Sequence, residues 1–142
     1  MYVRDARNRD EAWLLDHIEE MGLDEVGFRS RDYVIAVDEE KNERAGFGRV
    51  RVGKTDDGEG CELTSLGVLE EWRGQGVGAH IVERLVQTAG DEGFDVVYAF
   101  IDEPDYLRQF GFERVDVAQL PEHLRERLTR KQETVTPDAV PM

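Results

Sequence analysis

The sequence predicts a mixed α+β domain: one twisted sheet built from an antiparallel meander followed by a strand–helix–strand unit. The first half of the chain holds short apolar or alternating runs separated by turn residues, which is typical of antiparallel strands. In the second half, an amphipathic segment at residues 77–89 precedes an almost wholly apolar run at residues 94–101. This order is typical of a helix that leads into a buried parallel strand. The 142 residues suit one domain and are too few for two ordinary ones.

In the first half, we expect one helix set among strands. Asn8 or Asp10 could cap a helix that runs to about residue 21, where apolar residues recur at helical spacing, and Gly22 would end it. Turns are expected around the polar residues 40–43 and the glycine-rich residues 56–60. Strands are predicted from β-branched or period-two runs at residues 2–6, 33–37, 45–52 and 62–69.

In the second half, we expect the sheet to continue beyond the helix at residues 77–89, which Gly93 would end. Pro104 is placed to start a short helix that Gly111 would end. A further strand is expected at residues 112–117 and a last helix at residues 120–131. Two prolines and few apolar residues follow, so we expect one domain over residues 1–131 and a disordered tail at residues 132–142.

Charge is the main feature of the composition. The chain has 32 acidic and 18 basic residues, for a formal net charge of −14. Such a surface repels nucleic acid and anionic lipid at long range, so neither is an expected partner. Only three of the basic residues are lysines, and this composition favours a protein adapted to high salt over an ordinary acidic one.

Several classes of protein are disfavoured. With Cys61 as the one cysteine, these residues cannot form an internal disulfide or a Cys/His metal cluster. No run reaches the length of a membrane span, and the first residues are too charged for a signal peptide. We therefore expect a cytoplasmic protein without a metal.

The most informative segment is the loop Arg73-Gly74-Gln75-Gly76-Val77-Gly78, which joins a buried strand to an amphipathic helix. Closely spaced glycines let the backbone approach a ligand and adopt positive φ. A helix N-terminus offers unpaired N–H groups and a partial positive charge, and Arg73 adds a full one. The alternative is a glycine-rich turn that only packs the helix. The combination favours an anion site suited to a pyrophosphate.

Two other phosphate-binding motifs fit less well. A dinucleotide site has its first glycine directly after the strand, whereas residues 70–73 intervene here. A Walker-type loop needs Lys and then Ser or Thr after the last glycine, and Ala79-His80 stand there instead.

The loop Arg73–Gly78 resembles the Q/R-x-x-G-x-G/A signature of the GNAT superfamily of acyl-CoA N-acyltransferases. The preceding Leu66-Gly67-Val68 is similar to the fourth strand of that family, and Phe110-Gly111-Phe112 is similar to its "GF" turn. The resemblance spans residues 2–117 and implies a sheet whose strands splay to admit acetyl-CoA.

The resemblance also implies how the cofactor is bound. Leu66, Gly67 and Val68 would contact the pantetheine arm, and the Val68 N–H would polarise the thioester carbonyl. The pyrophosphate would lie on Arg73, Gly74, Gln75, Gly76, Val77 and Gly78. An acceptor amine would then attack directly, without a covalent enzyme intermediate. Cys61 could be suggested as an acyl carrier, but an isolated thiol at a strand start is more often structural.

Two catalytic residues are implied with alternatives left open. Glu62 matches the general base of histone-acetylating members, and period-two counting puts Glu62, Thr64, Leu66 and Val68 on one face. The alternative is a solvated carboxylate at the end of the strand. The family's tyrosine acid falls at Leu107, one residue after Tyr106, so Tyr106 is either the acid or a packing residue.

The expected function is acetyl transfer to a primary amine of a small molecule or amino acid. Residues 110–121 also resemble the end of acetyltransferase domains that act on glutamate in arginine biosynthesis. Arg29 and Arg31 could bind an acidic acceptor, although a solvated loop is favoured there. The alternatives are a protein N-terminal or lysine acetyltransferase and a sensor that binds acyl-CoA without turnover. A homodimer is suggested by the resemblance alone.

Overall fold

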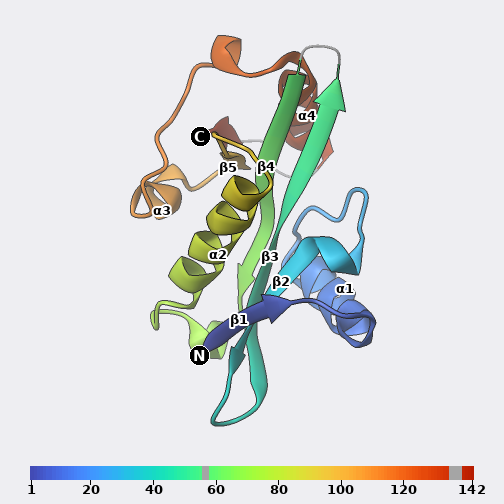
Figure 1. Ribbon diagram of the computed structural model, residues 1–142, viewed down its shortest axis with the longest axis vertical. Helices are drawn as coiled ribbons and strands as arrows, with labels where there is room; N and C mark the ends of the chain where they lie inside the picture. The colour runs from blue at the N-terminus through green and yellow to red at the C-terminus, as the bar shows by residue number, and fades with distance from the viewer. Residues whose placement is uncertain (56–57, 135–138) are drawn as a thin grey trace.

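A computed structural model describes residues 1–55, 58–134 and 139–142. Its sheet has the strand order β1-β2-β3-β4-β5-β6, with the first four strands forming the predicted antiparallel meander. The fifth strand joins parallel to the fourth (Figure 1). The predicted fold class is confirmed. The bounds of the strands are β1 Tyr2–Asp5, β2 Tyr33–Asp38, β3 Glu43–Thr55, β4 Gly58–Val68, β5 Tyr98–Ile101 and β6 Val140–Pro141.

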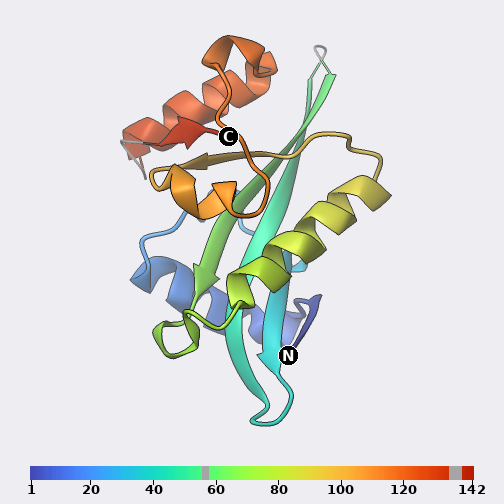
Figure 2. The same cartoon turned by 90° about the vertical axis from the view of Figure 1, so that its left-hand side faces the viewer.

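Helices cover both faces of the meander (Figure 2). One face packs on α2 through a cluster that includes Val34, Leu63 and Ile81. The opposite face packs on α1, where Leu14 and Ile18 meet β2 and β3. None of the helices in the described part of the chain is long and apolar enough to cross a membrane. The helices are α1 Glu11–Glu20, α2 Val77–Asp91, α3 Pro104–Arg108 and α4 Glu122–Thr134.

The predicted helix boundaries are close to the observed ones. Asp10 stands at the N-cap position of α1, and Gly22 follows this helix with a φ of +65°. Gly93 follows α2 with a φ of +94°, and Pro104 begins α3 as expected. Positive φ is open to glycine at little cost, which explains why the two helices end where they do. The predicted turn at residues 56–60 lies partly outside the described residues.

Strands β4 and β5 pair over a short distance and then separate. The paired positions are Glu62 with Tyr98 and Leu63 with Ala99, whereas β4 continues to Val68. A register shift between β3 and β4 accompanies Ser65, whose φ is +53°. This irregularity is a β-bulge, which bends its strand.

The bulge also corrects the face expected for β4. Glu62 and Thr64 lie opposite Arg51 and Arg49 of β3, on the α1 side of the sheet. Leu66 and Val68 instead belong to the cluster around α2. Period-two counting was therefore wrong across Ser65, because an extra residue in the ladder reverses the alternation.

The strands of the C-terminal part also differ from the expected ones. Residues 112–117 form no strand, since most of their side chains are exposed and have no core to cover. The position next to β5 is instead taken by β6, with Met142 N–H donating to the Ala99 carbonyl at 2.8 Å. Of residues 132–142, the described ones include the end of α4 at Thr134 and the strand β6, and Met142 is buried against the core beside α2. β5 itself begins at Tyr98 rather than at residue 94, because Val96 is exposed.

Candidate functional site

The predicted loop has the geometry of an anion site. Gly74 and Gly76 adopt φ values of +76° and +80°, and α2 begins at the next residue, Val77. The first N–H groups of a helix have no carbonyl partner within it, and they point out of its N-terminus together with the positive end of the dipole. Arg73 lies at the rim and donates from Nε to the Val68 carbonyl at 3.2 Å. The loop therefore offers main-chain donors and a cation to a polyanion.

This loop opens into a cavity of about 880 Å³ between the separated ends of β4 and β5, with α3 on the far side. Gly67 lies elsewhere, packed beneath Phe47 and Met21 on the other face of the sheet. Gln75 turns its side chain back to the Glu71 carbonyl, 3.1 Å away. The predicted cofactor-binding residues that do line the cavity are Leu66, Val68, Arg73, Gly74, Gly76, Val77 and Gly78.

The Val68 peptide is oriented toward this cavity. Leu69 N–H donates to the Ala45 carbonyl of β3 at 2.9 Å, and the next pair along the ladder is Val68 with Gly46. Antiparallel pairs alternate between bonded and non-bonded, so the Val68 N–H and C=O point away from β3. They therefore face the gap that β5 leaves open, where the N–H is placed to donate to a carbonyl oxygen.

Tyr106 also lines the cavity, although it stands one residue before the position expected from the family pattern. Its hydroxyl lies against the Cα of Gly78, and its ring packs edge-on against Phe110 at a centroid distance of 5.3 Å. Burial raises the pKa of the Tyr106 phenol, which keeps the proton on the oxygen. The structure thus brings Tyr106 and the loop together.

Glu62 lies elsewhere, on the α1 face, and it lines neither this cavity nor the smaller one beside it. Its side chain is 2% exposed and is held by two cations of α4, with Arg127 Nε at 3.1 Å and Lys131 Nζ at 3.6 Å. Burial raises the pKa of the Glu62 carboxyl, while the nearby cations oppose that shift. The structure therefore separates Glu62 from Tyr106.

A smaller cavity of about 120 Å³ adjoins the large one, and Leu66, Ile101 and Asp102 line both. Its polar wall contains Asp24, from the loop after α1, and Lys131, from α4. Sequence reasoning missed both residues. The scarcity of lysine was the one available signal for Lys131.

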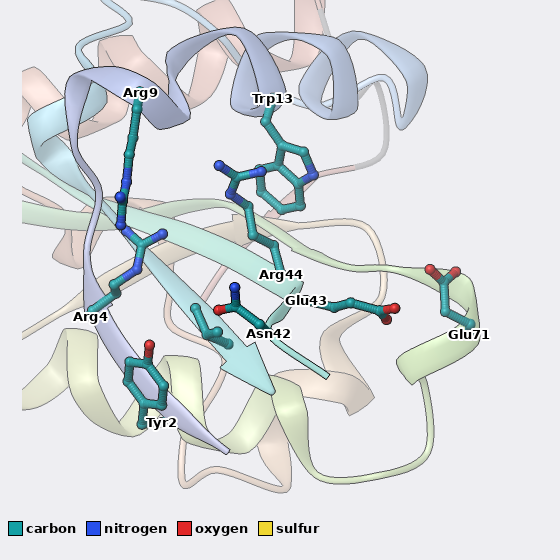
Figure 3. Close-up of a pocket in the computed structure, with 9 residues that line it drawn as sticks. Tyr2, Arg4, Arg9, Trp13, Asn42, Glu43, Arg44 and Glu71 are labelled. Atoms are coloured by element: carbon teal, nitrogen blue, oxygen red, sulfur yellow. The ribbon is translucent and has the colours of Figure 1, made fainter. Parts of the chain in front are cut away.

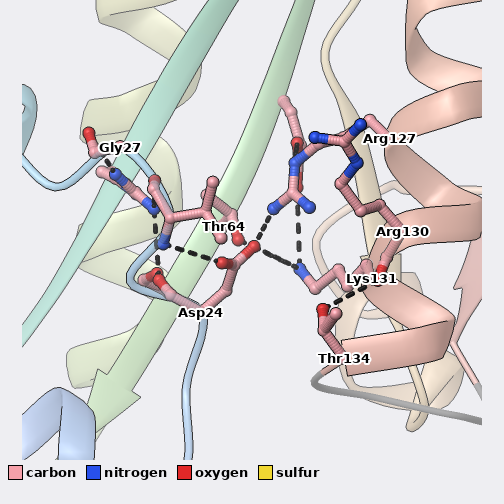
Figure 4. A network of polar contacts seen from close by, with 11 residues as sticks. Asp24, Gly27, Thr64, Arg127, Arg130, Lys131 and Thr134 are labelled. Carbon is pink, nitrogen blue, oxygen red and sulfur yellow. Dashed lines mark hydrogen bonds and ion pairs between the residues drawn. The ribbon is translucent and has the colours of Figure 1, made fainter.

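Asp24 ties the loop after α1 to the bulge of β4 and to α4 (Figure 4). Its carbonyl accepts hydrogen bonds from Arg49 and from the Ser65 hydroxyl, and its carboxylate forms an ion pair with Arg127. Lys131 Nζ donates to Thr64 Oγ1 at 3.0 Å. These contacts form a buried ionic cluster, defined here as Asp24, Arg49, Glu62, Arg127 and Lys131.

Three further features concern other predictions. Cys61 is fully buried, and burial raises the pKa of its thiol to about 12, which disfavours a role as acyl carrier. Arg29 is exposed and pairs with Asp32 at 3.0 Å, away from both cavities just described. Within the described residues, no group of three or more His, Cys, Asp or Glu side chains could hold a metal ion.

A separate cavity of about 530 Å³ lies between β1, α1 and the β2–β3 hairpin (Figure 3). Arg4 and Arg44 line it together with Trp13, and both arginines donate to the fully buried carboxylate of Asp10. These bonds hold the pKa of Asp10 well below its usual range. Since Asp10 already neutralises one charge of the pair, we assign a structural role to these contacts.

Comparisons with known proteins agree with this geometry. The model of the acetyltransferase (GNAT) family matches residues 2–115. An uncharacterized N-acetyltransferase, CT2212 of Chlorobaculum tepidum, is 27% identical over 64 residues, which are 45% of this chain and 41% of that protein. The match therefore spans less than half of that relative.

Two solved structures share the fold over almost the whole chain. One is N-acetylglutamate synthase from Neisseria gonorrhoeae in complex with coenzyme A and N-acetyl-glutamate, with a TM-score of 0.76 and 18% identity. It covers 98% of this chain, which spans 33% of the synthase. The other is Rv2747 from Mycobacterium tuberculosis in complex with CoA, with a TM-score of 0.75 and 20% identity. The match covers 92% of this chain and 82% of Rv2747.

Proposed function

Because the chain belongs to the acetyltransferase (GNAT) family, we propose that it transfers the acetyl group of acetyl-CoA to a primary amine of a small molecule or amino acid. The observation that carries the proposal is the glycine loop at the N-terminus of α2, which opens into a cavity of about 880 Å³. Its main-chain donors suit a pyrophosphate, and the gap between β4 and β5 suits an extended pantetheine arm. Acetyl-CoA supplies an activated thioester at this site.

Two groups of the chain act on the thioester, one at its carbonyl oxygen and one at its sulfur. The Val68 N–H donates to the thioester oxygen, where negative charge develops as the amine attacks. The amine nitrogen forms the new bond to the acetyl carbon while the carbon–sulfur bond breaks. The Tyr106 hydroxyl, held beside Gly78, then gives its proton to the departing thiolate.

The attacking amine must lose a proton, and we propose Glu62 as the group that receives it. Support comes from the burial that raises the pKa of this carboxyl toward the range of a useful base. Since Glu62 does not line either cavity, the proton would reach it through a bridging water beside Thr64. Asp102 lines both cavities and is the competing candidate.

Calorimetric titration with CoA, followed by an assay of thiol release from acetyl-CoA across an amine panel, tests the proposal. We expect CoA to bind and at least one small amine to release thiol. Release with peptides alone would instead indicate a protein acetyltransferase. Binding without release from any amine would indicate a sensor, and absence of CoA binding would contradict all three functions.

Other features stay predictions that accompany this function. A cytoplasmic location, the absence of nucleic-acid and membrane partners, and a homodimer are among them. Salt adaptation is another, since a net charge of −14 repels itself less when salt screens it. Thermal melting at rising KCl measures that effect, and a melting temperature that stays constant would contradict it.

A further inference from the structure

The buried ionic cluster has an excess of positive charge. It contains the cations Arg49, Arg127 and Lys131 but only the carboxylates Asp24 and Glu62. All five side chains are at most 13% exposed. Buried charges are ordinarily balanced, because an unpaired charge in a medium of low polarity is costly. Hence the cluster can accept one more negative charge.

Of the three cations, Lys131 is the one that lines the small cavity. Arg49 donates from Nη2 to carbonyls of the loop after α1, and Arg127 lies against both carboxylates. Lys131 Nζ has Thr64 Oγ1 at 3.0 Å, but Glu62 Oε2 is 3.6 Å away and Asp24 Oδ2 is 4.0 Å away. An ammonium group carries three donors, and only the first of these distances is that of a hydrogen bond.

The small cavity gives an anion access to Lys131. This residue lines it, and the cavity's volume of about 120 Å³ is far above the roughly 10–15 Å³ that one water needs. The same cavity shares Leu66 with the cavity of about 880 Å³, next to the separated strand ends. We call this larger cavity the cofactor cavity, because acetyl-CoA is proposed to bind there. A molecule held there by Lys131 would therefore have its other end near the Val68 peptide.

A carboxylate at the end of β5 also lines both cavities. Asp102 follows β5, is exposed, and lines both cavities. Its carboxylate would attract an ammonium group where the two cavities share their lining, whereas Lys131 lines only the small cavity. A molecule that carries a carboxylate and an amine a few bonds apart matches this arrangement.

We infer that the acceptor is a free amino acid, whose carboxylate binds Lys131 in the small cavity while its amine faces the cofactor cavity. This inference rests on the proposed acetyl transfer and narrows its substrate class. Recognition comes from a residue of α4, which lies beyond the part of the chain that the family model matches.

The first test needs no variant. Each of the twenty common L-amino acids and its C-terminal amide are supplied to the full chain with acetyl-CoA, and thiol release is measured. We also titrate the CoA-bound protein with the same compounds, so that binding is read without turnover. The inference predicts a preference of about 30-fold or more in kcat/KM, or in affinity, for the best acid over its amide. Equal use of acids and amides, or no binding of any acid to the CoA-bound protein, would overturn it.

The second test separates Lys131 from general effects on the fold. Lys131→Met should raise KM for the best amino acid about 10- to 100-fold and leave the affinity for CoA unchanged. Lys131→Arg should restore part of the preference for acids. Arg125→Met removes an exposed cation of the same helix and should change neither quantity. If Lys131→Met keeps its fold by thermal melting and also keeps the preference for acids, Lys131 does not bind the carboxylate. If the unmodified chain does not bind CoA, that result would instead count against the proposed function.

Discussion

The hydroxyl of Tyr106 lies so close to the Cα of Gly78 that a β-carbon at position 78 would overlap the phenol oxygen. This contact joins α3 to the first turn of α2, and both residues line the cavity of about 880 Å³ between β4 and β5. It explains why the third glycine of the loop has no side chain although its φ is not among the positive values.

Gly78→Ala is therefore expected to displace Tyr106 or shift the start of α2. We expect a loss of stability of about 1–3 kcal/mol, as for other overpacked sites, and an affinity for CoA lowered about tenfold. Gly90→Ala is the matched control, because it lies in the same helix with open space around it. That variant should bind CoA normally and melt at the same or a slightly higher temperature. Normal binding and stability of Gly78→Ala would contradict the contact.

Tyr106→Phe tests the proposed acid. The variant keeps the ring that packs against Phe110 and removes only the hydroxyl. We expect kcat to fall about 100-fold, the lower end of the usual contribution of a positioned acid, with the Kd for CoA unchanged. Burial raises the pKa of this phenol above its ordinary value of 10, so the acid stays protonated at neutral pH. The kcat of the unmodified protein should accordingly show no loss of this acid below pH 10, and an unchanged kcat in the variant would make Tyr106 a packing residue.

Cys61 tests direct attack against a covalent intermediate. Because burial raises the pKa of the thiol to about 12, the folded protein should react with a thiol reagent only after denaturation. Cys61→Ala should retain acetyl transfer within about twofold if the amine attacks acetyl-CoA directly. A labelled acyl-enzyme trapped in the native protein, and lost in this variant, would show that the chemistry passes through the thiol.

Asp10 is expected to make stability depend on pH. Arg4 donates to its carboxylate at 2.8 and 3.0 Å, and these bonds hold the pKa of Asp10 below its unfolded value. The contribution of ionised Asp10 to folding stability is therefore complete above the unfolded pKa, near pH 4. It is lost as the pH falls toward the folded pKa. Asp10→Asn keeps a hydrogen-bonding side chain, so it should cost roughly 1–3 kcal/mol at pH 7 and should flatten the loss of stability between pH 5 and pH 2.

Asp5→Asn provides the comparison for this effect. Asp5 also pairs with an arginine, Arg84 at 3.1 Å, but its side chain is 77% exposed. Ion pairs at the surface contribute little, so this variant should unfold like the unmodified protein. Denaturant unfolding at several pH values measures both variants. Equal effects of the two substitutions would show that burial of Asp10 does not matter.

The sequence predicted the parts of the structure that local rules decide. The meander, α2 and the loop at residues 73–78 follow from strand alternation, helical spacing and glycines at positive φ. The bulge at Ser65 could not be read in the same way, because nothing in its side chain marks an αL conformation. That one residue moved Glu62 to the opposite face from Leu66 and so out of the cofactor cavity.

Long-range contacts account for the remaining differences. Met142 pairs with Ala99 at the open edge of β5. Local composition cannot predict this pairing, because the two residues are far apart in the sequence. Lys131 and Asp24 are 107 positions apart, and only the packing of α4 on the sheet brings them together. The loop at residues 73–78 could thus be predicted from adjacent residues, whereas the ionic cluster around Lys131 could not.

The most direct measurement compares CoA binding by Gly76→Ala and Gly93→Ala in a calorimetric titration. Both glycines have positive φ, at +80° and +94°, and open space around them, so alanine strains the backbone by a similar amount, about 1–2 kcal/mol. Gly76 precedes the N-terminus of α2, and Gly93 follows its C-terminus. If the loop amides hold the pyrophosphate, Gly76→Ala raises the Kd for CoA at least tenfold and Gly93→Ala leaves it unchanged. Equal Kd values for the two folded variants would contradict the assignment of the site.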